Sequence, residues 1–373
     1  MSNIRVGVTG ANGFIGQHLL KHLEQSESFE ASVATRETFA SPGELSHFAR
    51  HQDCIVHFAG MNRGDDDEIY RTNVAITRAL IDALDGSPTV PHVVFASSTH
   101  RDTSSAYGRS KAECEALLED AAGRGILKLT TLVIPGVFGP GCRPFYNSVV
   151  ATFCHQIANG ETCEVHQDQE VHLISVHRLV EVIAGFVPEA PAERVTHIIE
   201  PMNSLRVSEL LVQLQVWHEA FSNDDVVPDL SDPFDAHLYA TLLSYIAPPL
   251  HAHQPTVHAD ERGRLFEIIK LANGGQVFFS TTKPGVVRGN HYHTRKIEWF
   301  CVLQGQARIR LREIRSEQIH EFDVCGERPQ FVSIPALYTH NIENTGSEDL
   351  LTMFWCNEIF DASNPDTIYE KVA

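Results

Sequence analysis

The sequence predicts two domains: an α/β fold with a doubly wound parallel sheet, followed by an all-β barrel of the jelly-roll type. At 373 residues the chain is longer than one hydrophobic core usually supports. It opens on a strand, a glycine-rich turn and a helix, whereas from residue 276 onward short apolar and polar alternations are separated by turn residues. The segment 245–255 is rich in Pro and His, as linkers often are. We therefore predict domains at 1–248 and 249–373.

Composition narrows the class of protein. Apolar residues make up 43% of the chain and charged residues 21%, which suits a globular protein. The net charge of −19 argues against nucleic acid as a partner, because phosphate backbones require clustered Lys and Arg. The first five residues lead directly into a strand-like segment without a signal-peptide core or a long apolar span. We therefore expect a cytoplasmic protein without membrane insertion.

The glycine-rich turn predicts a dinucleotide site. Ile4–Thr9 has the pattern of a short buried strand, and His18–Leu23 that of an amphipathic helix. Between them, Gly10 permits a tight turn, Gly13 lets the backbone approach a pyrophosphate, and Gly16 allows the helix to pack closely on the strand. The helix N-terminus then faces the phosphates. We predict a Rossmann-type cofactor site formed by Gly10, Asn12, Gly13, Phe14, Ile15 and Gly16.

The segments that follow indicate which dinucleotide binds. Arg36 comes after the second apolar run, where a ribose-binding Asp would mark an NAD enzyme. An Arg at this place suits a 2′-phosphate, so NADPH is the expected cofactor. A third strand, residues 54–58, ends in Ala59 and Gly60, which are small enough to leave room for the cofactor. Asn73 follows on a helix and is also expected at the cofactor.

A Tyr and a Lys four residues apart predict the chemistry. On a helix, Tyr107 and Lys111 share one face, so the ammonium can lower the pKa of the phenol and orient the nicotinamide ribose. The phenol can then donate a proton to a carbonyl. A hydroxyl after the preceding strand, residues 92–95, would hold the carbonyl oxygen; Ser98 is the first candidate, and Thr99 is expected at the substrate. This set predicts hydride transfer to a ketone.

The order of these motifs resembles the extended short-chain dehydrogenase/reductase family, which carries the glycine-rich turn, the Ala-Gly strand end, the Ser and the Tyr-xxx-Lys in this sequence. Pro135–Pro140 also resembles the substrate-loop motif of that family. The resemblance implies that Asn147 helps to hold the pyrophosphate or uracil of a nucleotide sugar. The chain departs from the family at residues 172–177, where it lacks the usual Arg and paired Asp.

The barrel region contains side chains that are typical metal ligands. If the segment around residue 291 is a strand, His291 and His293 point to the same face. Together with Glu298 from the next strand and His340 from across the barrel, they predict a mixed nitrogen and oxygen site for a divalent metal. Zinc, iron, manganese and nickel all suit such ligands. The spacing resembles the two motifs of the cupin family, except that Leu337 replaces a usual Gly.

A further resemblance concerns the surroundings of these ligands. The stretches 260–267 and 287–291 resemble the cupin-fold epimerases of nucleotide-linked 4-keto sugars, in which a His at the place of His291 is the catalytic base. Here the neighbouring ligand side chains indicate that His291 binds metal instead, so the base stays open, with Lys283 as one candidate. The resemblance also implies substrate contacts from two side chains of the first stretch, Arg262 and Glu267.

End to end, the chain resembles the bifunctional enzymes of capsular-polysaccharide and lipopolysaccharide biosynthesis that join such a reductase to a cupin domain. The resemblance is carried by segments of both domains and of the tail: Val8–Gly10, Tyr107–Gly108, Asn147–Phe153, Lys283–Gly285, Gly289–His291, Thr339–Asn344 and Asn364–Thr367. It implies that a zinc-bearing cupin domain epimerises carbon 3 of UDP-2-acetamido-2,6-dideoxy-L-arabino-4-hexulose. The first domain would then reduce the 4-ketone with NADPH to UDP-N-acetyl-6-deoxy-L-talosamine, a precursor of N-acetyl-L-fucosamine.

Two other functions stay open at this point. The first is a single-activity reductase whose metal-bearing cupin domain is structural and serves dimerisation. The second is a non-catalytic sensor that binds NADPH and a sugar. The Tyr107 and Lys111 pair favours an enzyme, because a binding module does not need a tuned phenol. Cupin barrels often pair, so we expect a homodimer formed through this domain.

Overall fold

The computed structural model describes residues 3–224, 226–247, 250 and 254–373. The chain divides into two compact units: unit 1 comprises Met1–Leu214 and Pro233–Ile246, and unit 2 comprises Gln215–Asp232 and Ala247–Ala373. The predicted boundary at residue 248 lies outside the described residues. Each unit is considered by itself below.

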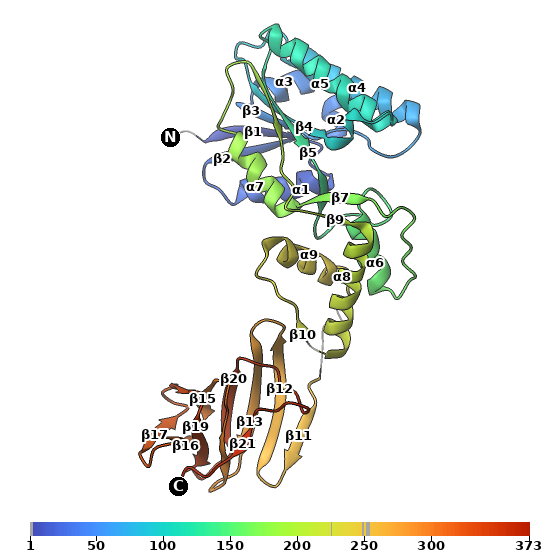
Figure 1. Cartoon of the computed structure of the whole chain (residues 1–373). Helices are drawn as coiled ribbons and strands as arrows, with labels where there is room; N and C mark the ends of the chain where they lie inside the picture. The colour runs from blue at the N-terminus through green and yellow to red at the C-terminus, as the bar shows by residue number, and fades with distance from the viewer. Residues whose placement is uncertain (1–2, 225, 248–249, 251–253) are drawn as a thin grey trace. The chain divides into compact units, whose positions relative to one another are not determined.

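Unit 1 is built on a parallel sheet with the strand order β2-β1-β3-β4-β5-β8 (Figure 1). Its strands are β1 (Ile4–Thr9), β2 (Phe29–Ala34), β3 (Cys54–His57), β4 (His92–Ser98), β5 (Lys128–Ile134) and β8 (Arg194–Ile198). From β1 the chain moves to β2 on one side and then crosses to β3 on the other. The carboxyl ends of β1 and β3 therefore flank the switch point, where ligands bind in open α/β sheets. The predicted doubly wound parallel sheet is confirmed.

Helices cover both faces of this sheet. Helices α1 (Phe14–Glu24) and α7 (Val176–Phe186) contribute Leu19 and Leu179 to the core on one face. The other face is covered by α3 (Pro42–Arg50), α4 (Asp66–Leu84) and α5 (Ala106–Gly123). Successive strand residues alternate between the two cores because side chains in a strand point to opposite faces. No helix in the described ranges is long and apolar enough to cross a membrane.

The remaining elements of unit 1 lie between the strands of this sheet in the chain or follow its last strand, β8. They include a small sheet of the order β6-β7-β9. Their bounds are α2 (Arg36–Ala40), η1 (Thr99–Asp102), β6 (Gly136–Phe138), α6 (Val149–Ala158), β7 (Glu170–Ser175), β9 (Asn203–Arg206) and α9 (Pro233–Leu243). Helix α8 (Val207–Glu219) continues from unit 1 into unit 2, and η2 (Ala220–Asp224) belongs to unit 2.

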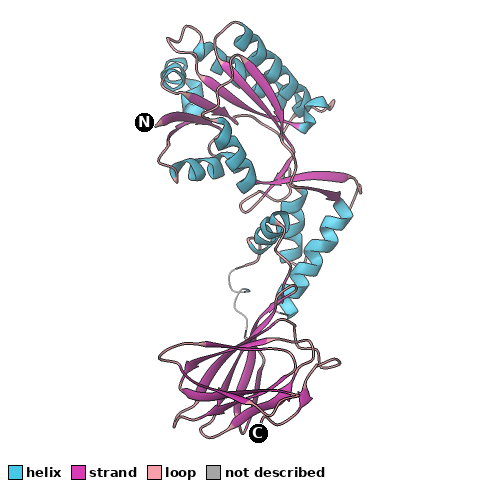
Figure 2. Cartoon of the chain, turned by 60° about the vertical axis from the view of Figure 1, so that its left-hand side comes forward, coloured by secondary structure: helices cyan, strands magenta, loops and turns pink. Residues whose placement is uncertain are grey.

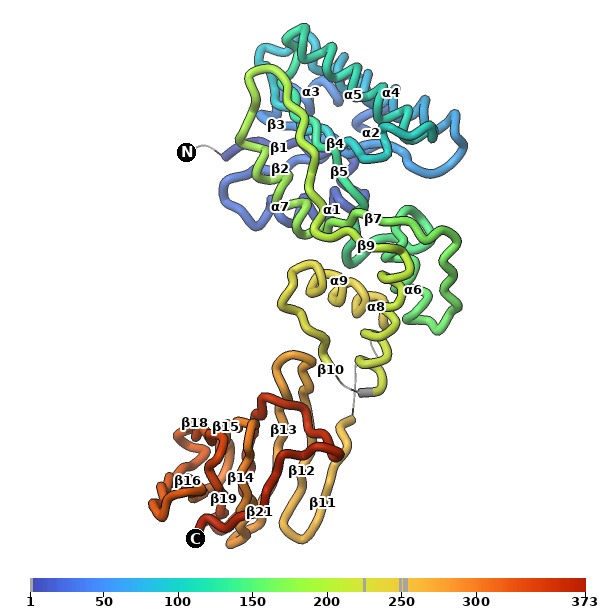
Figure 3. Tube along the Cα trace, in the orientation of Figure 1, coloured from blue at the N-terminus to red at the C-terminus, as the bar shows by residue number. Residues whose placement is uncertain are grey.

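Unit 2 consists of two sheets, and its antiparallel strands confirm the predicted all-β second domain (Figures 2 and 3). The first sheet has the order β10-β12-β13-β20-β15-β18, with β11 paired to β12, and the second has the order β17-β16-β19-β14-β21. Only the short β10 pairs in parallel among the described strands of this unit. Phe300 and Phe354 of the first sheet pack with Ile309 and Ile342 of the second in one apolar core.

The strands of unit 2 are β10 (Val226–Val227), β11 (Val257–Asp260), β12 (Gly263–Leu271), β13 (Gly275–Thr282), β14 (Val287–Tyr292), β15 (Glu298–Gln304), β16 (Gln306–Glu313), β17 (Ile319–Cys325), β18 (Phe331–Ile334), β19 (Tyr338–Asn344), β20 (Leu350–Cys356) and β21 (Ile368–Tyr369).

Candidate functional site

The glycine-rich turn lies at the switch point of the sheet in unit 1. Gly10 has a φ of +70°, and a Cβ added there would lie 2.7 Å from the backbone nitrogen of Ala59. A Cβ on Gly16 would lie 2.5 Å from the carbonyl oxygen of Gly10. Helix α1 begins at Phe14 with Gly13 as its N-cap and no side-chain cap, so its first N–H groups suit a phosphate. The residues present therefore fit a dinucleotide. The other predicted contacts, Asn12 and Ile15, belong to the same turn and first helical turn.

Asn73 of α4 links the loop after β3 to α5 through hydrogen bonds. Its side-chain oxygen accepts a hydrogen bond from the backbone N–H of Met61, and its amide donates to the Met61 carbonyl at 2.8 Å and to the Ser110 hydroxyl at 2.8 Å. Asn73 is buried, and a Cβ on Gly60 would lie 3.1 Å from its oxygen. The predicted cofactor residue thus shapes the loop that follows β3 through contacts within the protein.

Arg36 is the first residue of α2 and lies two residues beyond the end of β2. Because Ala34 pairs with Thr9, this position is adjacent to the glycine-rich turn. The preceding Thr35 caps the helix through its hydroxyl, which accepts from the N–H of Thr38. Arg36 itself is exposed. The placement agrees with the role predicted for this side chain at the ribose end of the dinucleotide.

Tyr107 and Lys111 lie on the first two turns of α5, beside the end of β4. The ammonium of Lys111 donates to the carbonyl of Ala96 at 2.7 Å and lies 5.7 Å from the centre of the Tyr107 ring. Burial lowers the pKa of Lys111 to about 8. Burial raises the pKa of Tyr107 to about 12, although a hydrogen bond with Ser98 opposes this shift, so the lowering expected from Lys111 is not seen. The structure thus brings Ser98, Tyr107 and Lys111 together.

Ser98 also caps the short helix η1, since its hydroxyl accepts from the N–H of His100 at 3.2 Å. Thr99, the predicted substrate residue, is the first residue of η1 and is exposed. The hydroxyl of Ser98 is therefore held in place by both η1 and the phenol of Tyr107. A group fixed in this way can orient a carbonyl oxygen next to the proton donor.

Asn147 lies on an exposed loop that contains Arg143 and contacts Arg63. It precedes Ser148, the N-cap of α6. In the same loop the centre of the Tyr146 ring lies 5.9 Å from the guanidinium group of Arg63 and 5.4 Å from that of Arg143. Arg63 also donates to the carbonyl oxygens of Phe145 and Tyr146. Because Arg63 follows β3, these contacts bring the Asn147 loop to the carboxyl edge of the sheet.

In unit 2 the four predicted metal ligands converge. Each of His291, His293, Glu298 and His340 offers one ligand atom within 4.8 Å of the others. Oε2 of Glu298 lies 3.1 Å from Nε2 of His293 and 3.2 Å from Nε2 of His340. Burial favours the neutral acid, but the contacts with both histidines outweigh it and hold the pKa of Glu298 below its usual value. Nε2 of His340 is buried and, apart from this contact with Glu298, has no hydrogen-bond partner in the described part of the chain. A buried nitrogen beside a carboxylate and two more imidazoles fits a divalent metal.

The two histidines of the first motif point to the same side, as expected for residues two apart on a strand. Their rings lie 5.0 Å apart. His291 belongs to β14, which ends at Tyr292, so His293 directly follows the strand. The strand register shifts just before them, between Gly289 and His291, where Asn290 has a φ of +61°. The sequence did not predict this bulge.

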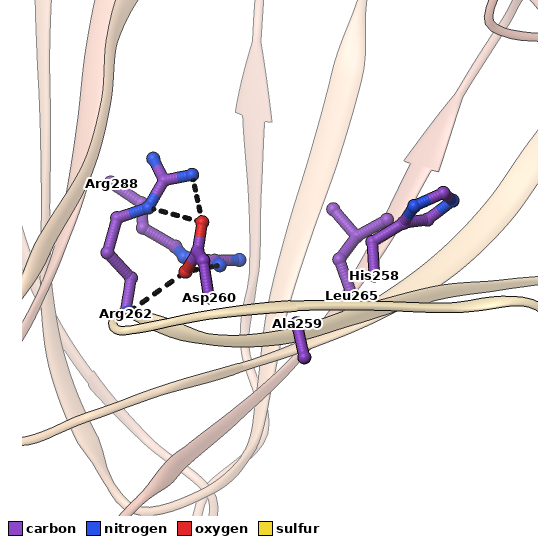
Figure 4. Close-up of a pocket in the computed structure, with 6 residues that line it drawn as sticks. All are labelled: His258, Ala259, Asp260, Arg262, Leu265 and Arg288. Atoms are coloured by element: carbon purple, nitrogen blue, oxygen red, sulfur yellow. Dashed lines mark hydrogen bonds and ion pairs between the residues drawn. The ribbon is translucent and has the colours of Figure 1, made fainter.

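A cavity of about 130 Å³ opens onto the ligands and contains two further polar side chains, Ser280 and Arg288. Arg288 also lines a neighbouring pocket of about 300 Å³, together with Asp260 and Arg262. Figure 4 shows the Asp260 carboxylate between the two guanidinium groups, with Arg262 at 2.5 Å and Arg288 at 3.7 Å. Nε of Arg288 is buried without a hydrogen-bond partner. Arg288 thus lines both pockets, and its Nε–H has no acceptor among the described residues.

Two predicted residues of this domain lie elsewhere. Lys283 is in the exposed turn after β13, where its N–H donates to the carbonyl of Arg262, and it does not line the cavity at the ligands. Strand β13 ends at Thr282, so the side chain of the next residue leaves the barrel interior. Glu267 lies on β12, 3.4 Å from Lys270, and lines neither pocket. The structure does not bring the candidate base or this acidic residue to the ligands.

Sequence reasoning missed Arg288 as a site residue, although it is three residues before His291 in a stretch that was singled out. It also missed Ser280, since one Ser in an alternating strand gives no signal. Asp366, which contacts the segment after His293, is 73 residues away from that histidine. Only the Asn364–Thr367 tail motif pointed to that region.

Comparison with known proteins gives matches over both units. The NAD dependent epimerase/dehydratase family matches residues 6–186, and the family described as polysaccharide biosynthesis C-terminal domain matches residues 258–368. The spore coat polysaccharide biosynthesis protein SpsL of Bacillus subtilis is 28% identical over 119 residues, which cover 29% of this chain and 79% of SpsL.

Two relatives extend over almost the whole chain. The UDP-2-acetamido-2,6-beta-L-arabino-hexul-4-ose reductase of Pseudomonas aeruginosa is 34% identical over 367 residues, 98% of each protein. The crystal structure of CapF, a capsular polysaccharide assembling protein of Staphylococcus aureus, matches with a TM-score of 0.86 and 33% identity over 98% of this chain and 100% of CapF. The chain therefore belongs to the two-domain family that includes CapF and the Pseudomonas reductase.

Proposed function

We propose that this protein is a bifunctional nucleotide-sugar enzyme. Unit 2 epimerises carbon 3 of UDP-2-acetamido-2,6-dideoxy-L-arabino-4-hexulose, and unit 1 reduces the 4-ketone with NADPH to UDP-N-acetyl-6-deoxy-L-talosamine, on the path to N-acetyl-L-fucosamine. The observation that carries the proposal is the identity of 34% over 98% of both chains to a reductase of such a UDP sugar. The Tyr107 and Lys111 pair, with its buried ammonium, and the four-ligand cluster offer each step a site.

The reduction is assigned to Tyr107, Lys111 and Ser98. The bound nicotinamide supplies the hydride to carbon 4. Tyr107 donates its phenolic proton to the ketone oxygen, which stays on carbon 4 as the new hydroxyl group, and Ser98 holds that oxygen. Lys111 stabilises the phenolate that forms, because its ammonium lies beneath the Tyr107 ring in a buried environment. Arg36 is assigned to the 2′-phosphate that distinguishes NADPH from NADH.

The nucleotide of the substrate carries negative charge, which a chain of net charge −19 must meet with local cations. Arg143 of the Asn147 loop and Arg63, which contacts that loop, supply them. They take the place of the Arg that the related family has near residues 172–177. Guanidinium groups suit a diphosphate because they can donate two parallel hydrogen bonds.

The epimerisation is assigned to the cavity at the metal ligands. The proton on carbon 3 is acidified by the adjacent 4-ketone, and a bound divalent metal, zinc in our proposal, supplies a Lewis acid that favours the deprotonated sugar. Arg288 lines this cavity and has a buried Nε without a hydrogen-bond partner, so its guanidinium can donate to an oxygen that gains charge. Arg262 lines the neighbouring pocket, which supports its expected contact with substrate.

A homodimer through the second domain forms part of the proposal. Trp299 of β15 is 44% exposed and Phe331 of β18 is 55% exposed, and their rings lie 5.8 Å apart. Aromatic side chains that share an exposed sheet face favour association. Sedimentation of the Trp299→Glu variant should show a lower mass than that of the native protein.

Deuterium incorporation tests the two steps separately. The UDP-4-keto sugar is incubated in D2O without NADPH, with native, metal-stripped and zinc-reloaded protein, and deuterium at carbon 3 is measured by mass spectrometry. We expect uptake only with metal, and we expect it to persist in the Tyr107→Phe variant, which no longer oxidises NADPH. Native protein that oxidises NADPH without any uptake would instead indicate a reductase with a structural barrel. Binding of NADPH and sugar without either reaction would indicate a sensor.

A further inference from the structure

The tail motif Asn364–Thr367 lies against the segment that follows the metal ligand His293. The carboxylate of Asp366 accepts hydrogen bonds from three consecutive backbone N–H groups, those of Thr294 at 3.0 Å, Arg295 at 2.9 Å and Lys296 at 3.1 Å. It also accepts from the Thr294 hydroxyl at 2.6 Å. The Asp366 side chain is only 3% exposed. A buried carboxylate with this many donors is firmly fixed in place.

The same residue contacts the ligand through its backbone. Nδ1 of His293 is within hydrogen-bond distance of the Asp366 carbonyl oxygen, while Nε2 of His293 faces Glu298. A neutral imidazole carries one proton, and a carbonyl oxygen can only accept. When Nε2 binds a metal, the one proton of the ring therefore sits on Nδ1, where the Asp366 carbonyl accepts it. The φ of +45° at Asp366 lets its side chain and its carbonyl both face residues 293–296.

The neighbours of Asp366 reinforce this contact. The ammonium of Lys296 donates to the carbonyl of Pro365 at 2.8 Å, and the guanidinium of Arg295 donates to the carbonyl of Asn364 at 3.1 Å. Just beyond, Tyr369 of β21 pairs with His291 of β14, and Figure 3 shows β21 beside β14. Two of the four ligand residues are thus contacted by the last ten residues of the chain.

We propose that residues 364–367 form a C-terminal clasp that sets the tautomer and orientation of His293, so that docking of the tail and metal binding stabilise each other. The inference rests on the metal centre of the proposed function. Asp366 acts as a positioning residue, since it touches the ligand and the backbone beside it but contributes no atom to the cluster. Groups that orient ligating imidazoles in this way typically change metal affinity by about 10–100-fold when removed.

Zinc affinity, measured by competition with a chromogenic chelator, tests the clasp without any assay of activity. In the Asp366→Asn full-length chain an amide N–H2 replaces one acceptor oxygen and faces backbone donors, so we expect affinity to fall by about 10–100-fold. The control is Asp323→Asn, because Asp323 is an exposed residue of β17 that pairs with Arg308 and lies outside the clasp; its affinity should match that of the native protein. Native-like affinity in Asp366→Asn would overturn the clasp. Absence of zinc binding by the native protein would overturn the metal centre and the clasp with it.

Hydrogen exchange of the native protein provides a measurement that does not depend on the folding of a variant. Addition of zinc to metal-free protein should slow exchange of the amides of Thr294, Arg295 and Lys296, and also of the tail peptide 362–369, because anything that binds the docked state stabilises it. Slower exchange at the ligands with unchanged exchange in the tail would show that the two are not coupled, and would overturn the proposal.

Discussion

The Tyr107 and Lys111 pair of unit 1 and the four-ligand cluster of unit 2 both bury ionisable groups, but they differ in how the charge is balanced. Lys111 is buried against the Phe95 ring and a backbone carbonyl, so desolvation dominates and lowers the pKa of its ammonium to about 8. In the cluster, Glu298 lies within 3.2 Å of two imidazoles, which keep the pKa of its carboxyl low despite burial.

The difference teaches how each site is assembled. The first site is local: Tyr107 and Lys111 are one helical turn apart, and any helix at this place puts them on one face. The second draws ligands from β14, β15 and β19 and support from the tail, so its geometry depends on strand register and on a bulge. The first site should therefore tolerate changes elsewhere in the chain better than the second does. Four predictions test this contrast.

The largest effect is expected when one ligand is removed from unit 2. The His340→Gln variant loses one of the three imidazoles of the cluster. Zinc affinity and deuterium uptake at carbon 3 should each fall by more than about 100-fold, because removal of a group that only orients a ligand already lowers metal affinity by about 10–100-fold. Reduction of sugar that is already epimerised should be unaffected. The control is His320→Gln, an exposed histidine on β17 of the same unit. Loss of reduction in His340→Gln would show that the two sites are not independent.

A smaller effect is expected from Lys111. Because burial lowers its pKa to about 8, the ammonium loses its proton as the pH rises through 8, and the reduction rate should fall above this pH. In Lys111→Met the rate should drop by roughly 100-fold and this pH step should vanish. The exposed Lys21 of α1 provides the control Lys21→Met. An unchanged pH profile in Lys111→Met would assign the step to another group.

The same pKa shift has a consequence for stability. Between about pH 8 and the ordinary value of 10.5 the unfolded chain binds more protons at Lys111 than the folded chain does. The free energy of unfolding should therefore rise with pH across this window, and the Lys111→Met variant should lose that part of the rise. Denaturant unfolding at the two ends of the window measures it.

The smallest effect is expected at the exposed Arg36. In Arg36→Ala the KM for NADPH should rise by about 10-fold, because one charge-assisted contact to the 2′-phosphate is lost, and the KM for NADH should change little. Arg178→Ala, an exposed arginine that pairs with Glu181 on α7, is the matched control. An equal change for both cofactors would mean that Arg36 does not distinguish them.

The sequence predicted the local features well for physical reasons. Gly10 and Gly16 are required wherever a helix packs this closely after a strand, and a Cβ at either position would clash with backbone in the structure. The four metal ligands were also predicted from spacing and converge as expected. The shared face predicted for His291 and His293 is confirmed, but the bulge just before them, between Gly289 and His291, has no clear signal in the sequence.

By itself, therefore, the sequence determined the two fold classes, the glycine-rich turn and the identities of the groups that carry charge and protons. These follow from spacings of a few residues and from side-chain chemistry. Only the tertiary structure decided that Lys111 is desolvated, that Arg288 rather than Lys283 reaches the cavity, and that Asp366 supports His293. Burial, strand ends and contacts across 73 residues depend on how the whole chain packs, which no local spacing specifies.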